Sequence, residues 1–180
     1  MLSAREFSCK VSCSENKNES FMKMYQFYEE QHLPVTINEA WSFFSNPRNL
    51  SLITPPSMNF LLTNAPEGEI YSGMIITYKV SPLFNIPLNW VTEITAADRP
   101  NHFIDEQRFG PYKFWHHRHS FEEAGKGVLM KDEVHYSLPF GIIGRMGHFL
   151  LIKKRVEGIF EYRREALTKM LSNEKEAFSI

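Results

Sequence analysis

The strongest constraint on the fold is a period-two alternation of apolar and polar residues, which begins near residue 58 and continues for about eighty residues. Alternation of this kind is typical of β-strands with one buried face. The interruptions carry Gly, Pro, Asn or Asp, the residues that turns require. Short connections between consecutive strands favour antiparallel pairing. The pattern predicts strands over 58–63, 74–80, 88–95, 103–108, 113–121 and 128–136.

Helical patterns flank this run. Before it, "MYQFYEEQHLPV" is strand-like, and Thr36 with Glu39 has the spacing of a capping box that starts a short helix. That helix should end at Pro47, and a second short one should end before Pro55. After the run, residues 142–171 carry apolar residues at spacings of three, four and seven, which predicts a long amphipathic helix. The order indicates an α+β fold: a curved antiparallel sheet of about seven strands, two short helices after the first strand, and a long C-terminal helix across the concave face.

Composition and charge narrow the class of protein. A length of 180 residues fits one domain, and a formal net charge of -1 gives no reason to expect nucleic-acid binding. No apolar run reaches about 18 residues and no signal peptide is evident, so stable membrane insertion is not expected and a cytoplasmic location is predicted. We expect a disordered tail over 1–21, a ligand-binding domain over 22–172 and a flexible tail over 173–180. Cys9 and Cys13 lie in the first tail and are interpreted as two reduced thiols.

One predicted strand lies within "GPYKFWHHRHSFEE" and carries two histidines between large aromatic residues. One of its faces would present Trp115, His117, His119 and Phe121. The other face would present Arg118, and an inward arginine without a partner is costly. The histidines are therefore predicted to face inward.

The next predicted strand, "VLMKDEVHY", supplies a carboxylate to the same face. Its apolar residues alternate in step with Asp132, so this side chain should face inward as well. Pairing of the two strands would bring Asp132 within reach of His117 or His119. The pattern does not settle which way Asp105 and Gln107 face.

Several interpretations of His117, His119 and Asp132 remain open. They could form a two-His-one-carboxylate site for Fe(II) or Zn(II). They could instead form a hydrogen-bonded relay that orients a ligand, or act as general acid and base. The histidines could also merely brace the sheet. A polar anchor within an aromatic wall is favoured, because small-molecule pockets are usually built in this way, and no cofactor or metal is predicted.

A ligand cavity follows from the predicted architecture. A curved sheet under a long helix separates from it where the curvature is strongest, which leaves space between them. No residue is assigned as catalytic, although His117, His119 and Asp132 are candidates. The predicted ligand-binding residues are Trp90, Trp115, His117, His119, Phe121, Asp132, Tyr136, Met146 and Phe149.

Three segments carry a resemblance to a known superfamily. They are "LPVTINEAWSFFSNPRNLSLITPP" (33–56), "HFIDEQRFGPYKFWHHRHSFE" (102–122) and "KDEVHYSLPFGIIG" (131–144). Together with the element order, they resemble the START-like, birch-pollen-allergen-like (SRPBCC) helix-grip proteins, especially the bacterial ligand-binding branch near polyketide cyclases and coenzyme-Q-binding START proteins. The resemblance covers residues 24–171 and implies the helix-grip fold. It says little about activity, since the superfamily includes lipid carriers, hormone receptors, cyclases and chaperone cofactors.

Three functions fit these observations. The first is intracellular binding or transport of a small, mainly apolar molecule, such as a lipid, quinone, polyketide or aromatic metabolite. The second is an acid/base cyclase, dehydratase or isomerase that uses the His and Asp residues on a polyketide-like substrate. The third is a protein-interaction module that uses the sheet or the C-terminal helix. We favour the first, so the chain is predicted to be a binding protein rather than an enzyme.

Overall fold

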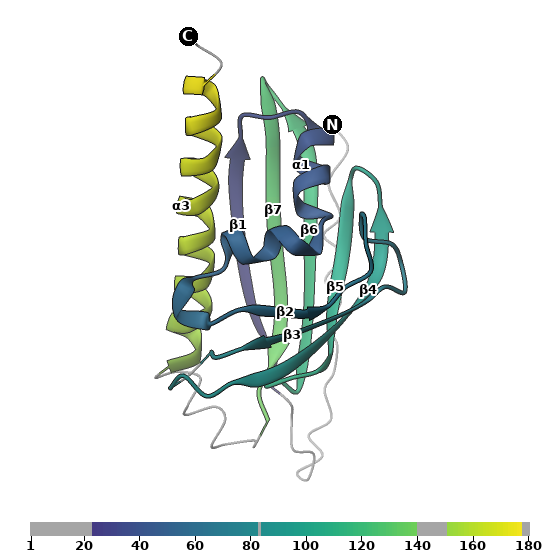
Figure 1. Cartoon of the computed structure of the whole chain (residues 1–180), viewed down its shortest axis with the longest axis vertical. Coiled ribbons are helices and arrows are strands. Elements are labelled where there is room, and N and C mark those ends of the chain that lie inside the picture. Colours follow the sequence, from purple (N-terminus) through teal and green to yellow (C-terminus); the bar gives the residue numbers. More distant parts are fainter. Residues whose placement is uncertain (1–22, 83, 140–150, 178–180) are drawn as a thin grey trace, which may run out of the picture.

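A seven-stranded antiparallel sheet and a long C-terminal helix form most of the structure, a computed structural model that describes residues 23–82, 84–139 and 151–177 (Figure 1). The strands are β1 (Tyr25–Leu33), β2 (Leu61–Asn64), β3 (Ile75–Val80), β4 (Leu88–Asp98), β5 (His102–Phe109), β6 (Phe114–Ala124) and β7 (Gly127–Ser137). The helices are α1 (Ile37–Phe44), the 3-10 helices η1 (Pro47–Ile53) and η2 (Pro56–Met58), and α3 (Lys153–Ala177). The predicted α+β architecture is confirmed.

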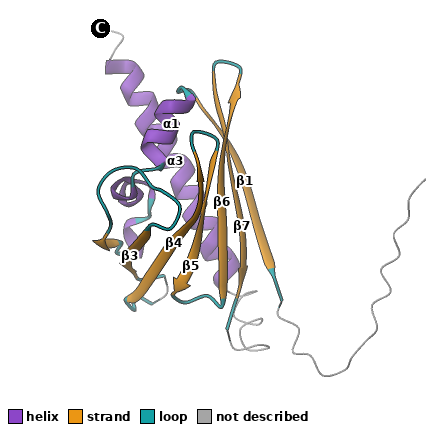
Figure 2. Cartoon of the chain, turned by 90° about the vertical axis from the view of Figure 1, so that its right-hand side faces the viewer, coloured by secondary structure: helices purple, strands orange, loops and turns teal. Residues whose placement is uncertain are grey.

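The strand order is β1-β7-β6-β5-β4-β3-β2, so the first strand lies beside the last. The pairing of β1 with β7 runs without a shift from Tyr25 opposite Tyr136 to Leu33 opposite Val128. The helices lie on one face of the curved sheet (Figure 2). On that face α3 contacts β1 and η1, whereas α1 contacts β6 and β7. Helices therefore cover the inward side chains of the strands that carry the histidines and Asp132.

One predicted strand begins later than expected. The pattern placed it over 58–63, but η2 ends at Met58 and β2 begins only at Leu61. Pro56 lies in the first turn of η2, where proline is well tolerated, and Asn59 has a left-handed backbone with a φ of 46°. The apolar alternation continues through this turn, so periodicity alone does not reveal it. The other five predicted strands are confirmed, with ends shifted by at most three residues.

The capping box at the start of α1 is confirmed. Oγ1 of Thr36 accepts a hydrogen bond from the backbone N–H of Glu39 at 3.3 Å, and the Glu39 carboxylate accepts one from the backbone N–H of Thr36 at 2.7 Å. Further along, Trp41 is buried with its ring edge-on to Phe103 and Phe121, and its Nε1 donates to Glu69 at 3.0 Å. These contacts fix α1 on the sheet.

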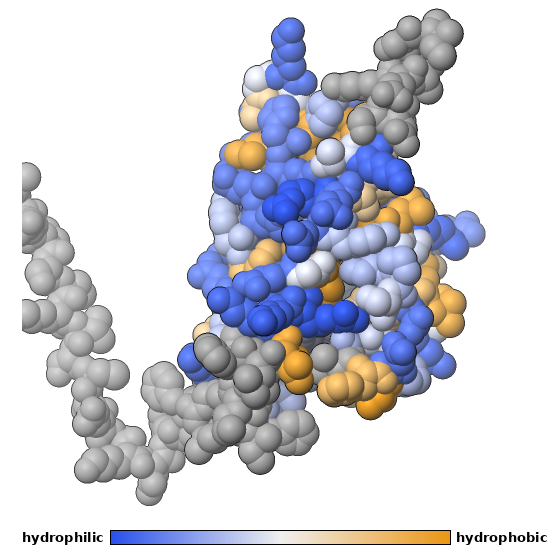
Figure 3. All heavy atoms as spheres, turned by 90° about the vertical axis from the view of Figure 1, so that its left-hand side faces the viewer, coloured by the Kyte–Doolittle hydropathy of each residue, from blue (hydrophilic) through white to orange (hydrophobic). Residues whose placement is uncertain are grey.

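The amphipathic character of the C-terminal helix is visible in its two faces. Val156, Phe160 and Leu167 are buried against the sheet, at spacings of four and seven residues. Seen from the α3 side, the surface of the molecule is mainly hydrophilic (Figure 3). The helix continues to Ala177, past the predicted domain end at 172, while its predicted beginning at 142 lies outside the described residues. Within the described residues, no helix has the length and apolarity needed to cross a membrane.

Candidate functional site

The two histidines of β6 and the aspartates of its two neighbouring strands face the same side of the sheet. In the antiparallel register His117 lies opposite Asp105 on β5, and His119 lies opposite Asp132 on β7. Residues opposite each other in paired strands point to the same face, so the register itself brings the four side chains together. His117, His119 and Asp132 are 4%, 6% and 1% exposed. The predicted inward facing of these three residues is therefore observed, and Asp105 joins them.

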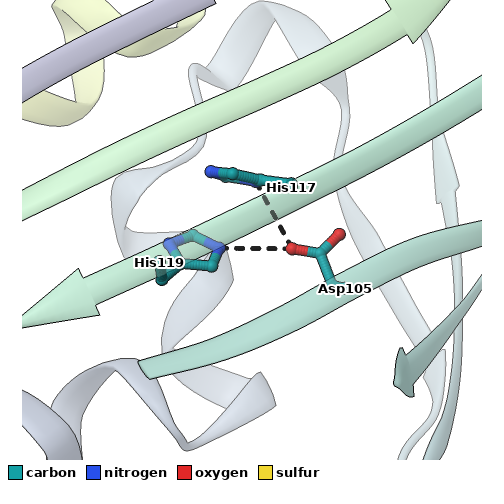
Figure 4. Close-up of side chains that lie close together, drawn as sticks. All are labelled: Asp105, His117 and His119. Carbon is teal, nitrogen blue, oxygen red and sulfur yellow. Dashed lines mark hydrogen bonds and ion pairs between the residues drawn. The ribbon is translucent and has the colours of Figure 1, made fainter. Parts of the chain in front are cut away.

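Each imidazole lies between the two carboxylates. Nε2 of His117 donates to Oδ1 of Asp132 at 2.9 Å, and its Nδ1 lies 3.3 Å from Oδ2 of Asp105. Nε2 of His119 donates to that same Asp105 oxygen at 3.2 Å, and its Nδ1 lies 2.7 Å from Oδ1 of Asp132, poorly aligned for a hydrogen bond. Figure 4 shows both rings turned toward Asp105. We call these four residues the His–Asp ring.

A fifth charged residue reaches the His–Asp ring from α3. Arg163 is 7% exposed, and its Nη1 lies 3.5 Å from Oδ2 of Asp132. Its guanidinium also lies over the Phe160 ring, 4.8 Å from the ring centre. Among the described residues, no acceptor forms a hydrogen bond with Nε or Nη1 of Arg163. Arg163 is thus a buried cation with unused donors.

The pKa values of the two histidines shift in opposite directions. Burial and the positive charge of His119 lower the pKa of His117. Burial opposes protonation of His119 too, but the nearby Asp132 and Asp105 carboxylates outweigh it and raise the pKa of that imidazole. In this protonation state, Arg163 and one imidazolium balance the two carboxylates. The buried group is then neutral overall, as burial in low dielectric requires.

The carboxyl groups are held ionised by the same contacts. Burial alone would raise the pKa of Asp132, but the charges of His119 and Arg163 hold it well below its usual value. Burial likewise opposes ionisation of Asp105, but the electrostatic interaction with His117 and the hydrogen bond from His119 outweigh it and lower the pKa of Asp105. Both carboxyl groups of the His–Asp ring are therefore ionised and hydrogen-bonded inside the protein.

A cavity of about 170 Å³ adjoins the His–Asp ring, between the sheet, η1 and α3. Its wall is mainly aromatic and aliphatic, and its charged lining residues are Asp105, His117, His119 and Arg163. Of the predicted ligand-binding residues, the cavity is lined by Trp90, Trp115, His117 and His119.

The remaining predicted ligand-binding residues are not among those that line the cavity. Phe121 packs against Trp41 and Phe44 beneath α1. Asp132 lies behind the two imidazoles, and Tyr136 stacks on Tyr25. The period-two alternation correctly predicted that these three side chains point inward, but an inward side chain does not always line the cavity. Met146 and Phe149 lie outside the described residues.

Two residues of the site were not assigned from the sequence. Asp105 stands in a strand of mixed polar residues, where alternation gave no preferred face. Arg163 follows Phe160 by three residues and precedes Leu167 by four, which places it on the buried stripe of α3. The sequence signal for Arg163 was its charge, since the helical period favours an apolar residue at this position.

Gln107, whose facing was also left open, lies near the end of β5 and holds the turn that follows. Its Nε2 donates to the backbone oxygen of Tyr112 at 2.7 Å, and its Oε1 accepts from the Tyr112 backbone N–H at 3.2 Å. A Cβ at Gly110 would lie 2.3 Å from that Oε1, so glycine lets the amide approach. The Gly110-Pro111-Tyr112 motif thereby holds Tyr112 in the cavity wall.

No protein-family model matches the sequence, and no curated protein matches it. Solved structures match over most of their length. A START superfamily protein from Mycobacterium smegmatis has a TM-score of 0.62 at 12% identity, covering 82% of this chain and 97% of that one. A protein from Thermus thermophilus has a TM-score of 0.56 at 17% identity, covering 87% and 100%. The allergen Ara h 8.0201 has a TM-score of 0.55 at 15% identity, covering 82% and 99%.

The chain has the helix-grip fold. The resemblance stated for residues 33–56, 102–122 and 131–144 is therefore confirmed at the level of the fold. Identities of 12–17% carry no function from these structures to this chain, so the helix-grip cavity and its charged end have to be interpreted from their own residues.

Proposed function

We propose that this helix-grip protein is an intracellular binding protein for a small, mainly apolar molecule with an oxygen acceptor at one end. The apolar part would lie against the aromatic wall, and the acceptor, a carboxylate or a carbonyl, would face Arg163 and the histidines. The observation that carries the proposal is the buried Nε of Arg163, which lies beside the cavity and has no hydrogen-bond partner among the described residues.

Unused buried donors are costly, which is why they indicate a missing partner. A buried N–H without an acceptor costs about 1–3 kcal/mol, and more when the group is charged. Nε1 of Trp90 is a second such donor in the cavity wall. A ligand carboxylate or carbonyl would accept a hydrogen bond from Nε of Arg163, and arginine is well suited to binding a carboxylate. The pocket thus combines an apolar wall with a few polar anchors.

The size of the cavity restricts the ligand. Its volume of about 170 Å³ is close to that of an engineered protein cavity of about 150 Å³ that takes up benzene. A molecule with one or two small rings suits this volume better than a long acyl chain does. Among the expected ligand classes, an aromatic metabolite is therefore preferred to a lipid.

Acid/base catalysis is a second candidate, supported by the opposite pKa directions of adjacent imidazoles. A protonated His119 could donate a proton and a neutral His117 could accept one, and both line the cavity. Pairs of titratable groups whose pKa values are driven apart are a hallmark of acid/base sites. The reaction would be a cyclisation, dehydration or isomerisation of the bound molecule.

The test uses the full chain and matched pairs of small aromatic compounds. 1-Naphthoate and benzoate would be compared with naphthalene and benzyl alcohol by isothermal titration calorimetry and by thermal unfolding. We expect the acids to bind and to raise the melting temperature, since a ligand that binds only the native state stabilises it. The variant Arg163→Met should bind the acids at least tenfold more weakly, while Arg164→Met, altered on the exposed side of α3, should bind as the wild type does.

Two results would count against the proposal. One is the absence of binding by every compound, which would leave the cavity without a ligand of this class. The other is equal affinity of the acids for the wild type and Arg163→Met, which would remove Arg163 as the anchor. Mass spectrometry of the compounds after incubation separates the two candidates, because an enzyme would change them and a carrier would return them intact.

A further inference from the structure

We propose that Asp105, His117 and His119 bind one divalent transition-metal ion at the charged end of the cavity, with Asp132 as the residue that orients both imidazoles. This site differs from the one considered from the sequence, in which Asp132 was the third ligand. It does not rest on the proposed function, since the ion would bind whether or not an apolar molecule occupies the cavity.

The three proposed ligand atoms converge on one point. Oδ2 of Asp105 lies 3.3 Å from Nδ1 of His117 and 3.2 Å from Nε2 of His119, and one ligand atom from each residue falls within 4.8 Å of the other two. Metal bonds of about 2.0–2.2 Å to nitrogen and oxygen place neighbouring ligand atoms about 3 Å apart. The two short distances match that spacing (Figure 4).

Asp132 occupies the opposite nitrogen of each ring. Its Oδ1 lies 2.9 Å from Nε2 of His117 and 2.7 Å from Nδ1 of His119. Metal-binding histidines usually direct their second ring nitrogen to a carboxylate, which fixes the tautomer and strengthens the ligand. Asp132 holds the His117 ring in this way through a hydrogen bond, and its carboxylate also lies beside Nδ1 of His119 without an aligned hydrogen bond. With a metal bound, the ring protons would lie on the Asp132 side and a lone pair of each ring would face Asp105, so the ion would replace the hydrogen bond from Nε2 of His119 to Asp105.

In that tautomer, the lone pairs would need a cation between them. With both protons toward Asp132, two ring lone pairs and a carboxylate oxygen face one another at 3.2–3.3 Å, which is repulsive. An extra proton on His119 relieves the contact of that ring with Asp105 but leaves the contact of His117 unrelieved. A metal ion between the three atoms relieves all of them at once.

The ligand set and its surroundings indicate the class of metal. Two imidazoles and one carboxylate suit Zn(II) or Fe(II), and three protein ligands leave coordination positions open. The open side faces the cavity, because all three residues line it. A divalent ion and Arg163 together carry one more positive charge than Asp105 and Asp132 carry negative charge. An anionic ligand is therefore expected at the open position.

The test measures binding of the metal alone to the full chain after treatment with a chelator. Co(II) and Zn(II) would be titrated into a Cys9→Ser/Cys13→Ser background, which removes the two thiols as rival ligands. We expect one ion per chain, visible absorption bands for Co(II), and changes on Zn(II) binding in the ¹⁵N signals of Nδ1 of His117 and Nε2 of His119.

Two variants locate the ion. Asp105→Asn keeps the size of the ligand and removes its charge, so affinity should fall by at least tenfold. His116→Ala is the matched control, since His116 lies on the same strand, faces outward and pairs with Glu106, and its loss should leave affinity unchanged.

The expected spectroscopic result does not depend on the folding of any variant of the site. Absence of stoichiometric binding by the Cys9→Ser/Cys13→Ser protein would overturn the proposal. Loss of binding in His116→Ala, or ¹⁵N changes at other histidines instead, would place the ion elsewhere and would also overturn it.

Discussion

Arg163 on α3 and Asp132 on β7 form an ion pair inside the protein, with 3.5 Å between Nη1 and Oδ2. Arg163 is 7% exposed and Asp132 is 1% exposed, so neither charge is shared with bulk water. The pair joins the covering helix to the sheet at the point where the cavity begins. The charged end of the cavity therefore also contributes to the attachment of α3.

The first prediction concerns the stability of that attachment. Arg163→Met leaves Asp132 without its helical partner, and removing one member of a buried pair typically costs about 3–5 kcal/mol. Arg164→Met removes an exposed pair with Glu29 and should cost less than about 1 kcal/mol. Urea unfolding at neutral pH measures both. Equal losses in the two variants would show that the buried pair does not hold α3.

The second prediction is a loss of stability in acid, measured with a chelator present. The folded pKa values of Asp105 and Asp132 lie below those of the unfolded chain, so the unfolded chain takes up protons first as the pH falls through about 4. Their stabilisation is complete above that pH and is lost below it. The lowered pKa of His117 and the raised pKa of His119 act in opposite directions on stability below about pH 6.5.

A variant isolates the contribution of the buried carboxylate on β7. Asp132→Asn should have a lower free energy of unfolding than the wild type at pH 7. Between pH 5 and pH 3 its free energy of unfolding should fall less steeply, because the unfolded variant no longer takes up a proton at residue 132. Each such proton contributes about 1.4 kcal/mol per pH unit to the slope of the free energy of unfolding against pH. Glu29, Arg163 and Arg164 also face this region and are unchanged. Glu133→Gln, on the outward face of the same strand, should keep the wild-type slope. An unaltered slope in Asp132→Asn would refute the assignment.

The third prediction concerns α1, whose end contributes Phe43 and Phe44 to the cavity wall. Thr36→Ala removes the capping hydrogen bond and should lower the free energy of unfolding by about 1 kcal/mol. Asn38→Ala, exposed within the first turn, should change it by less than about 0.5 kcal/mol. Chemical unfolding compares the two, and a Thr36→Ala protein as stable as the Asn38→Ala protein would contradict the role of the cap.

Most of the fold was predictable because its signals are local. Period-two alternation gave five of the strands and the inward facing of His117, His119 and Asp132, while Thr36 and Glu39 marked the start of α1. Strand register then explains why the histidines and Asp132 meet. Alternation does not predict which of the inward residues line the cavity. That depends on how α1 and α3 lie across the sheet.

The charged residues that complete the site were harder to predict for a related reason. Asp105 belongs to a polar strand, and its facing is decided by pairing with β6 rather than by its own sequence. Arg163 interrupts an apolar stripe, and what makes this tolerable is a carboxylate on a strand far away in the sequence. The role of both residues depends on long-range contacts, which a single sequence does not show.

The last prediction uses two neighbouring residues of β3 that face opposite ways. Ile76 is 6% exposed and lines the cavity, whereas Ile75 is 42% exposed on the other face. Ile76→Ala should cost about 2–5 kcal/mol in stability, because it removes packed methyl groups and enlarges an existing space. Ile75→Ala should cost less than about 1 kcal/mol.

The same pair reports on binding. In Ile76→Ala the larger cavity should accept a three-ring acid such as 9-anthroate, and binding it should restore part of the lost stability. Ile75→Ala should keep the ligand preference of the wild type. Calorimetry with 1-naphthoate and 9-anthroate on the three proteins gives the comparison. If Ile76→Ala loses stability but its preference between the two acids does not move, then the space beside Ile76 is not where these molecules bind.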